Sequence, residues 1–266
     1  MDTVDYSDVD NLNSAARRKK RRAAHIFTLA FIGVWAVYSA SVEAYVMPGP
    51  WPVLIRFFEF FSDMSFVMHM MWSLIHILTA IVISFFIGLS FAILPFYLSI
   101  TKTAIDHRLT PFLNSYSGIG WTLLAVLWFG INDLTVVFAI TMVLVPFTII
   151  NIREGLVQID REILEMSKSF SRNKLKNFKL IIIPSLYPYL FASIRISFGV
   201  SWKVALTAEL FGGNKGLGYL LNLARQDFDT PLILVVILII VIFVYSIERF
   251  FFKPIQNNLA AHNANI

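Results

Sequence analysis

The feature that most constrains the fold is a 38-residue segment, from Met64 to Thr101, that contains no Asp, Glu, Lys or Arg. A helix needs about 20 apolar residues to cross the roughly 30 Å hydrocarbon core of a bilayer. The segment is too long for one straight crossing and short for two, so it predicts either one long, tilted helix or two short ones. That choice sets the topology of the whole chain.

Composition places this segment in a membrane protein. The chain is 57% hydrophobic and 15% charged, whereas soluble domains are about 45–50% apolar and about 25% charged. Its charged residues collect between apolar blocks, which is typical of a polytopic membrane protein. The absence of cysteine excludes disulfides and thiolate sites. The net charge of +5 indicates basic cytoplasmic loops rather than a nucleic-acid partner.

The distribution of Lys and Arg decides between the two topologies. If Met64–Thr101 is one helix, 17 of these residues lie on the inside and three on the outside, as the positive-inside rule requires. Two helices would instead place the basic loop 152–183 outside. The sequence therefore predicts an all-α membrane protein with both termini cytoplasmic and six transmembrane helices, over residues 23–42, 64–101, 111–129, 134–151, 186–209 and 231–250.

These spans predict one membrane domain, residues 23–254, with a disordered cytoplasmic tail over 1–22 and a cytoplasmic C-terminal tail over 255–266. The run Arg17–Arg22 directly precedes the first span. Such a run anchors the chain at the cytoplasmic surface and favours anionic membrane lipid.

The cytoplasmic loop at about 152–185 carries more than topology requires. Ile163, Met166 and Phe170 form an apolar stripe on a first short helix. A second amphipathic segment, Lys174–Ile183, should end at Pro184, which lacks a backbone donor. An apolar stripe on two cytoplasmic helices with no core to bury it indicates a docking surface. The alternative is an ordinary basic loop that serves only topology.

The loop resembles a known family. Glu165-Met166-Ser167, Ser171 and Ile181-Ile182-Ile183-Pro184 fall at the spacing of the EAA motif of ATP-binding-cassette importer permeases. Over Pro48–Pro254 the chain is similar to the nitrate/sulfonate/taurine branch of these binding-protein-dependent permeases, with further matches at Leu127–Gly130, Pro188, Arg195, Gly199, Trp202, Ala208-Glu209 and Gly216–Tyr219.

The chain departs from the motif at three positions. Met166 and Ser167 stand where the family has alanines, and Ser171 stands where it has the glycine that turns the chain between the two helices. If residue 171 has a positive φ, serine costs on the order of 1 kcal/mol there. A small shift in the geometry of the coupling helices is the expected consequence.

The resemblance implies a type I importer-like fold in the inner membrane, in which this chain pairs with a second copy of itself. It also implies a separate cytoplasmic ATPase dimer, which binds the ATP and Mg, and an extracytoplasmic solute-binding protein. The chain itself is then not an enzyme and holds no cofactor. The residues implied in ATPase coupling are Glu165, Met166, Ser167, Phe170, Ser171, Arg172, Leu175, Phe178 and Pro184, and those implied in the outer loop are Gly216, Gly218 and Tyr219.

The solute implied by this branch is small and anionic, of the sulfonate, taurine, nitrate or bicarbonate type. An uncharged vitamin precursor carried by the same family remains an alternative. So does a secondary transporter driven by an ion gradient, although the chain lacks the two matched halves typical of that class.

Three ionisable residues in the fifth span, Arg195, Lys203 and Glu209, are candidates for a translocation path, because exposing charge to lipid is costly. Arg195 and Glu209 lie near the span ends and could instead reach the headgroups, whereas Lys203 lies deeper. His69 and His76 share a helix face without carboxylates at helical spacing. We therefore expect them to pack and predict no metal site.

Overall fold

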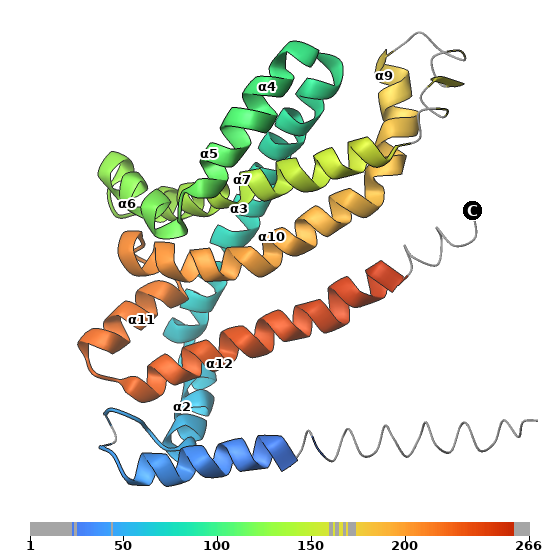
Figure 1. Ribbon diagram of the computed structural model, residues 1–266. Helices are drawn as coiled ribbons and strands as arrows, with labels where there is room; N and C mark the ends of the chain where they lie inside the picture. Colours follow the sequence, from blue (N-terminus) through green and yellow to red (C-terminus); the bar gives the residue numbers. More distant parts are fainter. Residues whose placement is uncertain are drawn as a thin grey trace, which may run out of the picture.

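The computed structural model describes residues 23, 26–43, 45–159, 162, 165, 166, 169 and 174–257. Throughout these residues the secondary structure is helical (Figure 1). The α-helices are an unlabelled one over Ile26–Ala40, α2 (Pro50–Ser62), α3 (Met64–Tyr97), α4 (Lys102–Ala104), α5 (Thr110–Ser115), α6 (Gly118–Phe129), α7 (Asp133–Gln158), α9 (Lys174–Asn177), α10 (Ile183–Gly212), α11 (Leu217–Gln226) and α12 (Thr230–Ile247). A 3-10 turn covers Ser99–Thr101, and π turns cover Ile105–Leu109, Phe178–Ile182 and Glu248–Phe252.

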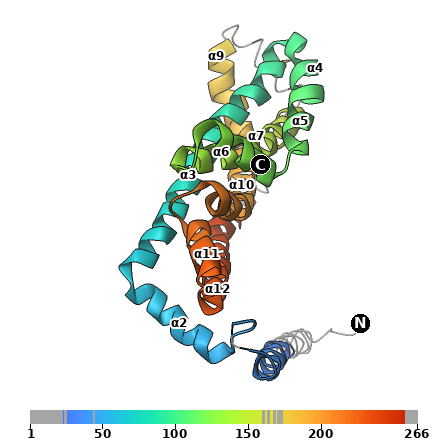
Figure 2. The same ribbon diagram turned by 90° about the vertical axis from the view of Figure 1, so that its left-hand side faces the viewer.

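The long uncharged segment forms one helix, α3, which confirms the prediction of one helix rather than two. Asp63 caps its start, because the Ser65 amide donates to the Asp63 carboxylate at 2.8 Å. With 34 residues, α3 is about 50 Å long, and it crosses α7, α10 and α12 obliquely (Figures 1 and 2). Because α3 is longer than the roughly 30 Å core of a bilayer, a single crossing by this helix requires a tilt.

Four helical segments are long and apolar enough to cross a membrane: Met64–Tyr97, Asp133–Gln158, Phe178–Gly212 and Thr230–Asn257. A bent pair supplies a fifth, and Ile26–Ala40 is a shorter apolar helix at the place of the predicted first span. Four of the six predicted spans are therefore matched in place, the first corresponds only to the shorter helix Ile26–Ala40, and the third requires a correction.

The prediction of one continuous helix over residues 111–129 is wrong. The helical segments Ser99–Ser115 and Gly118–Phe129 meet at an angle of 86°. Tyr116 is extended, and the Ser117 hydroxyl accepts the Gly120 amide at 3.2 Å to start α6. A side chain that satisfies a free amide in this way begins a new helix rather than continuing the old one. The third span is therefore broken.

The expected helix end at Pro184 is also wrong. The chain remains helical from Lys174 through α10, because residues Phe178–Ile182 widen into a π turn in which the Ile183 amide donates to the Phe178 carbonyl. A proline lacks the donor that an interior helical position uses; Pro184 directly follows the π turn and stands at the second residue of α10, so the altered hydrogen-bond register lies where that donor is missing. Residues Lys174–Gly212 thus form one uninterrupted helical run, which bends between α9 and α10 (Figure 1).

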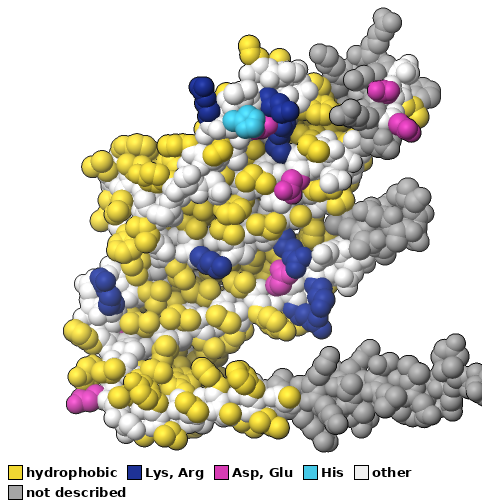
Figure 3. Space-filling model, in the orientation of Figure 1, with side chains coloured by type: hydrophobic (Ala, Val, Ile, Leu, Met, Phe, Trp, Pro, Cys, Tyr) yellow, Lys and Arg dark blue, Asp and Glu magenta, His cyan; other side chains and the backbone are white. Residues whose placement is uncertain are grey.

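α7 lies at the centre of the fold between α3 and α10, and Ile140, Leu144 and Ile149 on it are fully buried or nearly so. A second group of buried side chains, which we call the inner cluster, joins the same three helices beside α9; it consists of Ala92, Ile152, Leu156, Ile159, Ile182 and Leu186. The outer face is largely hydrophobic (Figure 3). This is the pattern expected of helices surrounded by lipid.

The chain reverses at two opposite ends of the molecule (Figure 1). The α9 end carries the junction of α7 with α9, the first residues of the Ile26–Ala40 helix and the C-terminal end of α12. The opposite, α11 end carries α11 and the turns that connect it to α10 and α12. Both ends of the described chain therefore lie at the α9 end.

Candidate functional site

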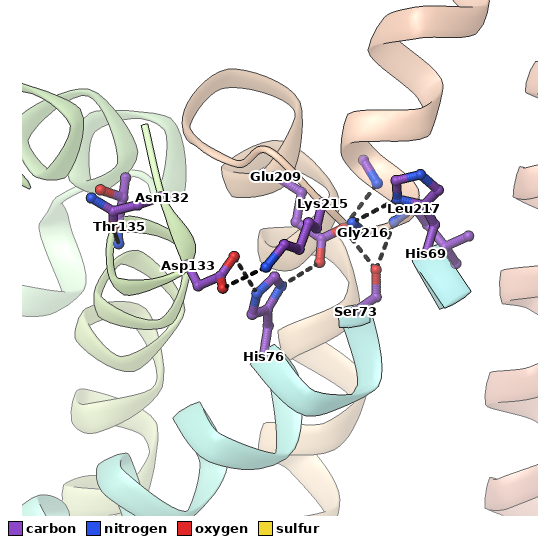
Figure 4. Close-up of polar contacts among 11 residues, drawn as sticks. His69, Ser73, His76, Asn132, Asp133, Thr135, Glu209, Lys215, Gly216 and Leu217 are labelled. Atoms are coloured by element: carbon purple, nitrogen blue, oxygen red, sulfur yellow. Dashed lines mark hydrogen bonds and ion pairs between the residues drawn. The ribbon is translucent and has the colours of Figure 1, made fainter. Parts of the chain in front are cut away.

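Polar side chains from several helices meet around Glu209 at the α11 end (Figure 4). The Glu209 side chain is fully buried on α10. Its carboxylate accepts hydrogen bonds from the Ser73 hydroxyl at 2.7 Å and from the Gly218 amide at 2.9 Å. His76 Nδ1 lies 2.9 Å from the other carboxylate oxygen. A buried charge is tolerated where it is paired and hydrogen-bonded in this way.

The contacts continue from His76 towards α7. His76 Nε2 lies 3.5 Å from the Asp133 carboxylate, and Lys215 Nζ lies 3.3 Å from the second oxygen of that carboxylate. Lys215 Nζ also sits 4.0 Å from the centre of the Trp72 ring, within cation–π range. We refer to His69, Ser73, His76, Asp133, Glu209 and Lys215 as the Glu209 cluster.

The turn before α11 is held directly by this cluster. The Leu217 amide donates to the Ser73 hydroxyl oxygen at 2.7 Å, and the Gly216 amide donates to His69 Nδ1 at 3.2 Å. Gly216 has φ +101°, and a Cβ added there would overlap the Glu209 carboxylate. Glycine is therefore required by both the backbone conformation and the close approach.

This arrangement fixes helices rather than performing a reaction. One carboxylate ties α3, α10 and the start of α11 together, and Asp133 connects the cluster to the start of α7. Among the described residues, no group of three His, Cys, Asp or Glu side chains is placed to hold a metal ion. The cluster is thus best described as an interhelical polar network at the α11 end.

The three predicted path residues occupy different environments. Glu209 is buried, so it does not extend to the headgroups. Arg195 pairs with Glu248 and with Gln256 at the end of α12. Lys203 alone is exposed, about two-thirds of the way along α10. The structure therefore does not bring these three residues together.

The predicted coupling residues are only partly described. Glu165 and Met166 are helical and exposed, and Met166 is 54% exposed. Phe178 is half-buried: its ring lies 6.3 Å from that of Tyr97 and packs against the inner cluster. Pro184 is exposed at the start of α10. Ser167, Phe170, Ser171 and Arg172 lie outside the described residues, as does the side chain of Leu175.

The three predicted outer-loop residues lie together at the Glu209 cluster. Gly216 and Gly218 surround the Glu209 carboxylate, and the Tyr219 ring lies 5.7 Å from the His69 ring. Sequence reasoning missed the partners Ser73, His76, Asp133 and Lys215. The only available sign was the i, i+4, i+7 spacing of His69, Ser73 and His76, which places three polar side chains on one face of an otherwise apolar helix.

Comparisons with known proteins identify the family. The profile of a family described as "Binding-protein-dependent transport system inner membrane component" matches residues 15–254. A Bacillus subtilis protein named as an aliphatic sulfonates transport permease, SsuC, is 25% identical over 224 residues, which cover 81% of each chain. The bicarbonate transport system permease protein CmpB of Synechococcus elongatus is 27% identical over 224 residues, which cover 79% of this chain and 80% of CmpB.

A solved structure shows the same fold. A chain of the MetNI methionine ABC transporter, in an inward-facing conformation, superposes with a TM-score of 0.62 at 17% identity and covers 70% of this chain and 92% of that one. The family profile spans nearly the whole sequence, and the fold agrees with it. This chain therefore belongs to the binding-protein-dependent transport system inner membrane components, the permease subunits of ATP-binding-cassette importers.

Proposed function

We propose that the chain pairs with a second copy to form the path of a small anionic solute, and that a separate cytoplasmic ATPase dimer docks on the segment between α7 and α10. The observation that carries this proposal is the rigid attachment of that segment. Its two ends enter the inner cluster through Ile159 and Ile182. A displacement of the segment would consequently move both helices that form the centre of the fold.

Close packing of α7 on α10 supports this coupling. A Cβ added at Gly155 would lie 2.5 Å from Tyr189 Cγ and 2.8 Å from Leu186 Cδ2, so the two helices approach without room for a side chain. Such packed contacts are not continuously deformable and transmit rigid-body shifts. Glu165 and Met166, exposed on the segment, supply contacts for the ATPase, while Phe178 anchors the segment to the membrane helices.

Lys203 supports an anionic solute. It is exposed on the face of α10 that also presents Gly199, where nothing lies within 4 Å of an added Cβ. An ionisable side chain inside a span normally faces a protein interior or a water-filled path. We therefore assign Lys203 to the path between two copies, and assign Arg195 and Glu209 to interhelical contacts. The names of SsuC and CmpB refer to sulfonates and bicarbonate, both of which are anions.

The membrane orientation follows from the same assignment. With the ATPase docked at the α9 end, that end faces the cytoplasm together with both chain termini. The α11 end, with residues 41–49 and 213–229, then faces the solute-binding protein. The excess of Lys and Arg in the segments assigned to the cytoplasm supports this orientation.

Gentle purification of the tagged chain from its native membrane tests the docking assignment. We expect an ATPase subunit to accompany the chain, to remain with the Glu43→Arg variant and to be lost from Glu165→Arg. The two substitutions reverse the same charge at exposed positions on opposite ends of the molecule. If Glu165→Arg retains the ATPase, the proposal that the ATPase docks on this segment is contradicted. If the chain is isolated alone, the proposal of an ATPase partner is contradicted.

A further inference from the structure

A cavity of about 410 Å³ lies between the α9 ends of α10 and α12, outside the inner cluster and the Glu209 cluster. Its lining carries three cations and one carboxylate; the lining residues are Arg195, Tyr245, Glu248, Arg249, Lys253, Gln256 and Asn257. Arg195 forms an ion pair with Glu248. Among the described residues, Arg249 and Lys253 have no ion-pair partner. The cavity therefore retains two uncompensated positive charges.

The hydrogen-bonding groups of this cavity are mostly donors. Arg195 on α10 contacts Glu248 and Gln256 in the helical run that continues from α12 to Asn257, so its fork holds the two runs together at the edge of the cavity. Arg249 and Lys253 offer guanidinium and ammonium donors, and Tyr245 adds a hydroxyl. A set of this kind suits the oxygens of a phosphate group.

The approach to the cavity along α12 is apolar. Ile237, Val241 and Tyr245 follow one another at four-residue spacing on α12, which places them near one helix face. Arg249 lies in the π turn Glu248–Phe252 that follows α12 and Lys253 just beyond it, and both line the cavity together with Tyr245. Ile237 is 47%, Val241 60% and Tyr245 68% exposed. The face thus changes from aliphatic, through an amphipathic tyrosine, to cationic at the end of the helix. Figure 3 shows basic side chains gathered with acidic ones near this end of α12.

This gradient matches the order of groups in a membrane lipid. Aliphatic side chains contact acyl chains, tyrosine belongs at the interface, and Lys and Arg meet headgroup phosphates on the cytoplasmic side. A soluble anion would need the cationic part alone and would gain nothing from the exposed aliphatic face. We propose that the cleft between α10 and α12 is a binding site for an anionic phospholipid, with Arg249 and Lys253 at its phosphate and headgroup.

The experiment uses the complex purified with its native partners, reconstituted in nanodiscs of phosphatidylcholine that contain a trace of phosphatidylglycerol with a photoreactive headgroup. Crosslinked peptides are identified by mass spectrometry. We expect crosslinks in residues 245–257 that unlabelled phosphatidylglycerol competes away and additional phosphatidylcholine does not. Equal competition by the two lipids would overturn the proposal. This arm needs no substitution and no transport activity.

Variants locate the headgroup contact. In the Arg249→Gln/Lys253→Gln double variant we expect the crosslink yield to fall at least about tenfold, since both charges near the surface contribute to binding. The control is Lys102→Gln/Arg108→Gln, which removes two exposed cations outside the cavity and should leave the yield unchanged. An unchanged yield in the first variant would contradict the assignment of these two residues.

Two other occupants give distinct results. If millimolar inorganic phosphate displaces the lipid crosslink, the cavity is a site for soluble phosphate anions and the lipid proposal fails. If residues 245–257 of two copies of the chain crosslink to each other through a bifunctional lysine reagent, the face is a contact between copies and the proposal again fails. Neither result depends on whether the complex transports an anion.

Discussion

At the scale of single residues, the most constrained position is the Glu209 carboxylate. Its hydrogen bonds from Ser73 and Gly218 and its contact with His76 occur without solvent. In the Ser73–Glu209 bond the serine is the donor, because a carboxylate can only accept, and the same hydroxyl oxygen also accepts the Leu217 amide. The carboxylate thus acts only as an acceptor for two of its partners. That restriction determines which substitutions can be tolerated.

We expect Glu209→Ala to destabilise the protein far more than Glu209→Gln. Alanine leaves buried donors of Ser73 and Gly218 unpaired and opens a cavity, a change that costs about 3–5 kcal/mol. A glutamine oxygen can keep both donors, and its amide can donate to His76 Nδ1 when the ring proton is on Nε2. The check is the midpoint of thermal unfolding in detergent. Equal loss in both variants would show that the charge itself, rather than its hydrogen bonds, is required.

Gly216 offers a second test of the same turn. We expect Gly216→Ala to cost at least about 1 kcal/mol, because its φ is +101° and the new Cβ would overlap Glu209. The matched control is Gly33→Ala, at a helical glycine with nothing within 4 Å of an added Cβ; it should be neutral or slightly stabilising. Unfolding midpoints of the two variants measure the difference. A neutral Gly216→Ala would mean that the turn is not held as described.

At the scale of elements, α7 and α10 approach each other at Gly155 without room for a side chain. We expect Gly155→Ala to force the helices apart, because its Cβ would lie 2.5 Å from Tyr189 Cγ. In a Tyr189→Ala background the same substitution should be better tolerated. A double-mutant cycle on thermal stability should then give a coupling energy of about 0.5–3 kcal/mol. Additive effects would indicate that the two residues do not touch.

The elements also show what could be predicted from the sequence. The single helix α3 followed from the asymmetry of Lys and Arg, because exchanging one helix for two moves the basic loop across the membrane. The boundary between α6 and α7 followed from turn chemistry: Gly130 has φ +76°, and the Asn132 side chain accepts the Thr135 amide. The turn signal depends on neighbouring residues, and the charge signal is a sum over loops. Both can therefore be obtained from one sequence without knowing which segments are in contact.

The features that could not be predicted depend on contacts between distant segments. The apolar pattern runs without interruption through Tyr116 and Ser117 and therefore predicts a continuous helix. In the structure the Ser117 side chain caps a new helix at this point. The π turn at Phe178–Ile182 is a register shift that composition does not report. For His76, the carboxylate partners come from positions 133 and 209 on other helices. Helical spacing within one segment could not show these partners.

At the scale of the whole molecule, the same three helices are in contact at both ends of the protein. The segment proposed to dock the ATPase enters the inner cluster at the α9 end, and the same helices, α3, α7 and α10, meet again in the Glu209 cluster at the α11 end. Helices fixed to one another at both ends move as a rigid body. This is the property that alternation between inward-facing and outward-facing states requires.

The proposed pairing of two copies places Lys203 on both sides of the path. We expect Lys203→Gln to lower the rate of anion uptake about tenfold or more, because a positive charge is removed from each side of the path. Lys203→Arg should retain much of the activity, since it keeps the charge. Initial uptake rates at several solute concentrations provide the measurement. Unchanged uptake by Lys203→Gln would place this residue outside the path.

Uptake into proteoliposomes tests the central claim most directly. The complex purified with its ATPase is reconstituted with ATP inside or outside and supplied with the solute-binding protein and a radiolabelled sulfonate, nitrate or bicarbonate. We expect uptake of an anion that requires both ATP hydrolysis and the binding protein. This uptake should persist when ion gradients are dissipated. Uptake driven by an ion gradient in the absence of ATP would contradict this expectation.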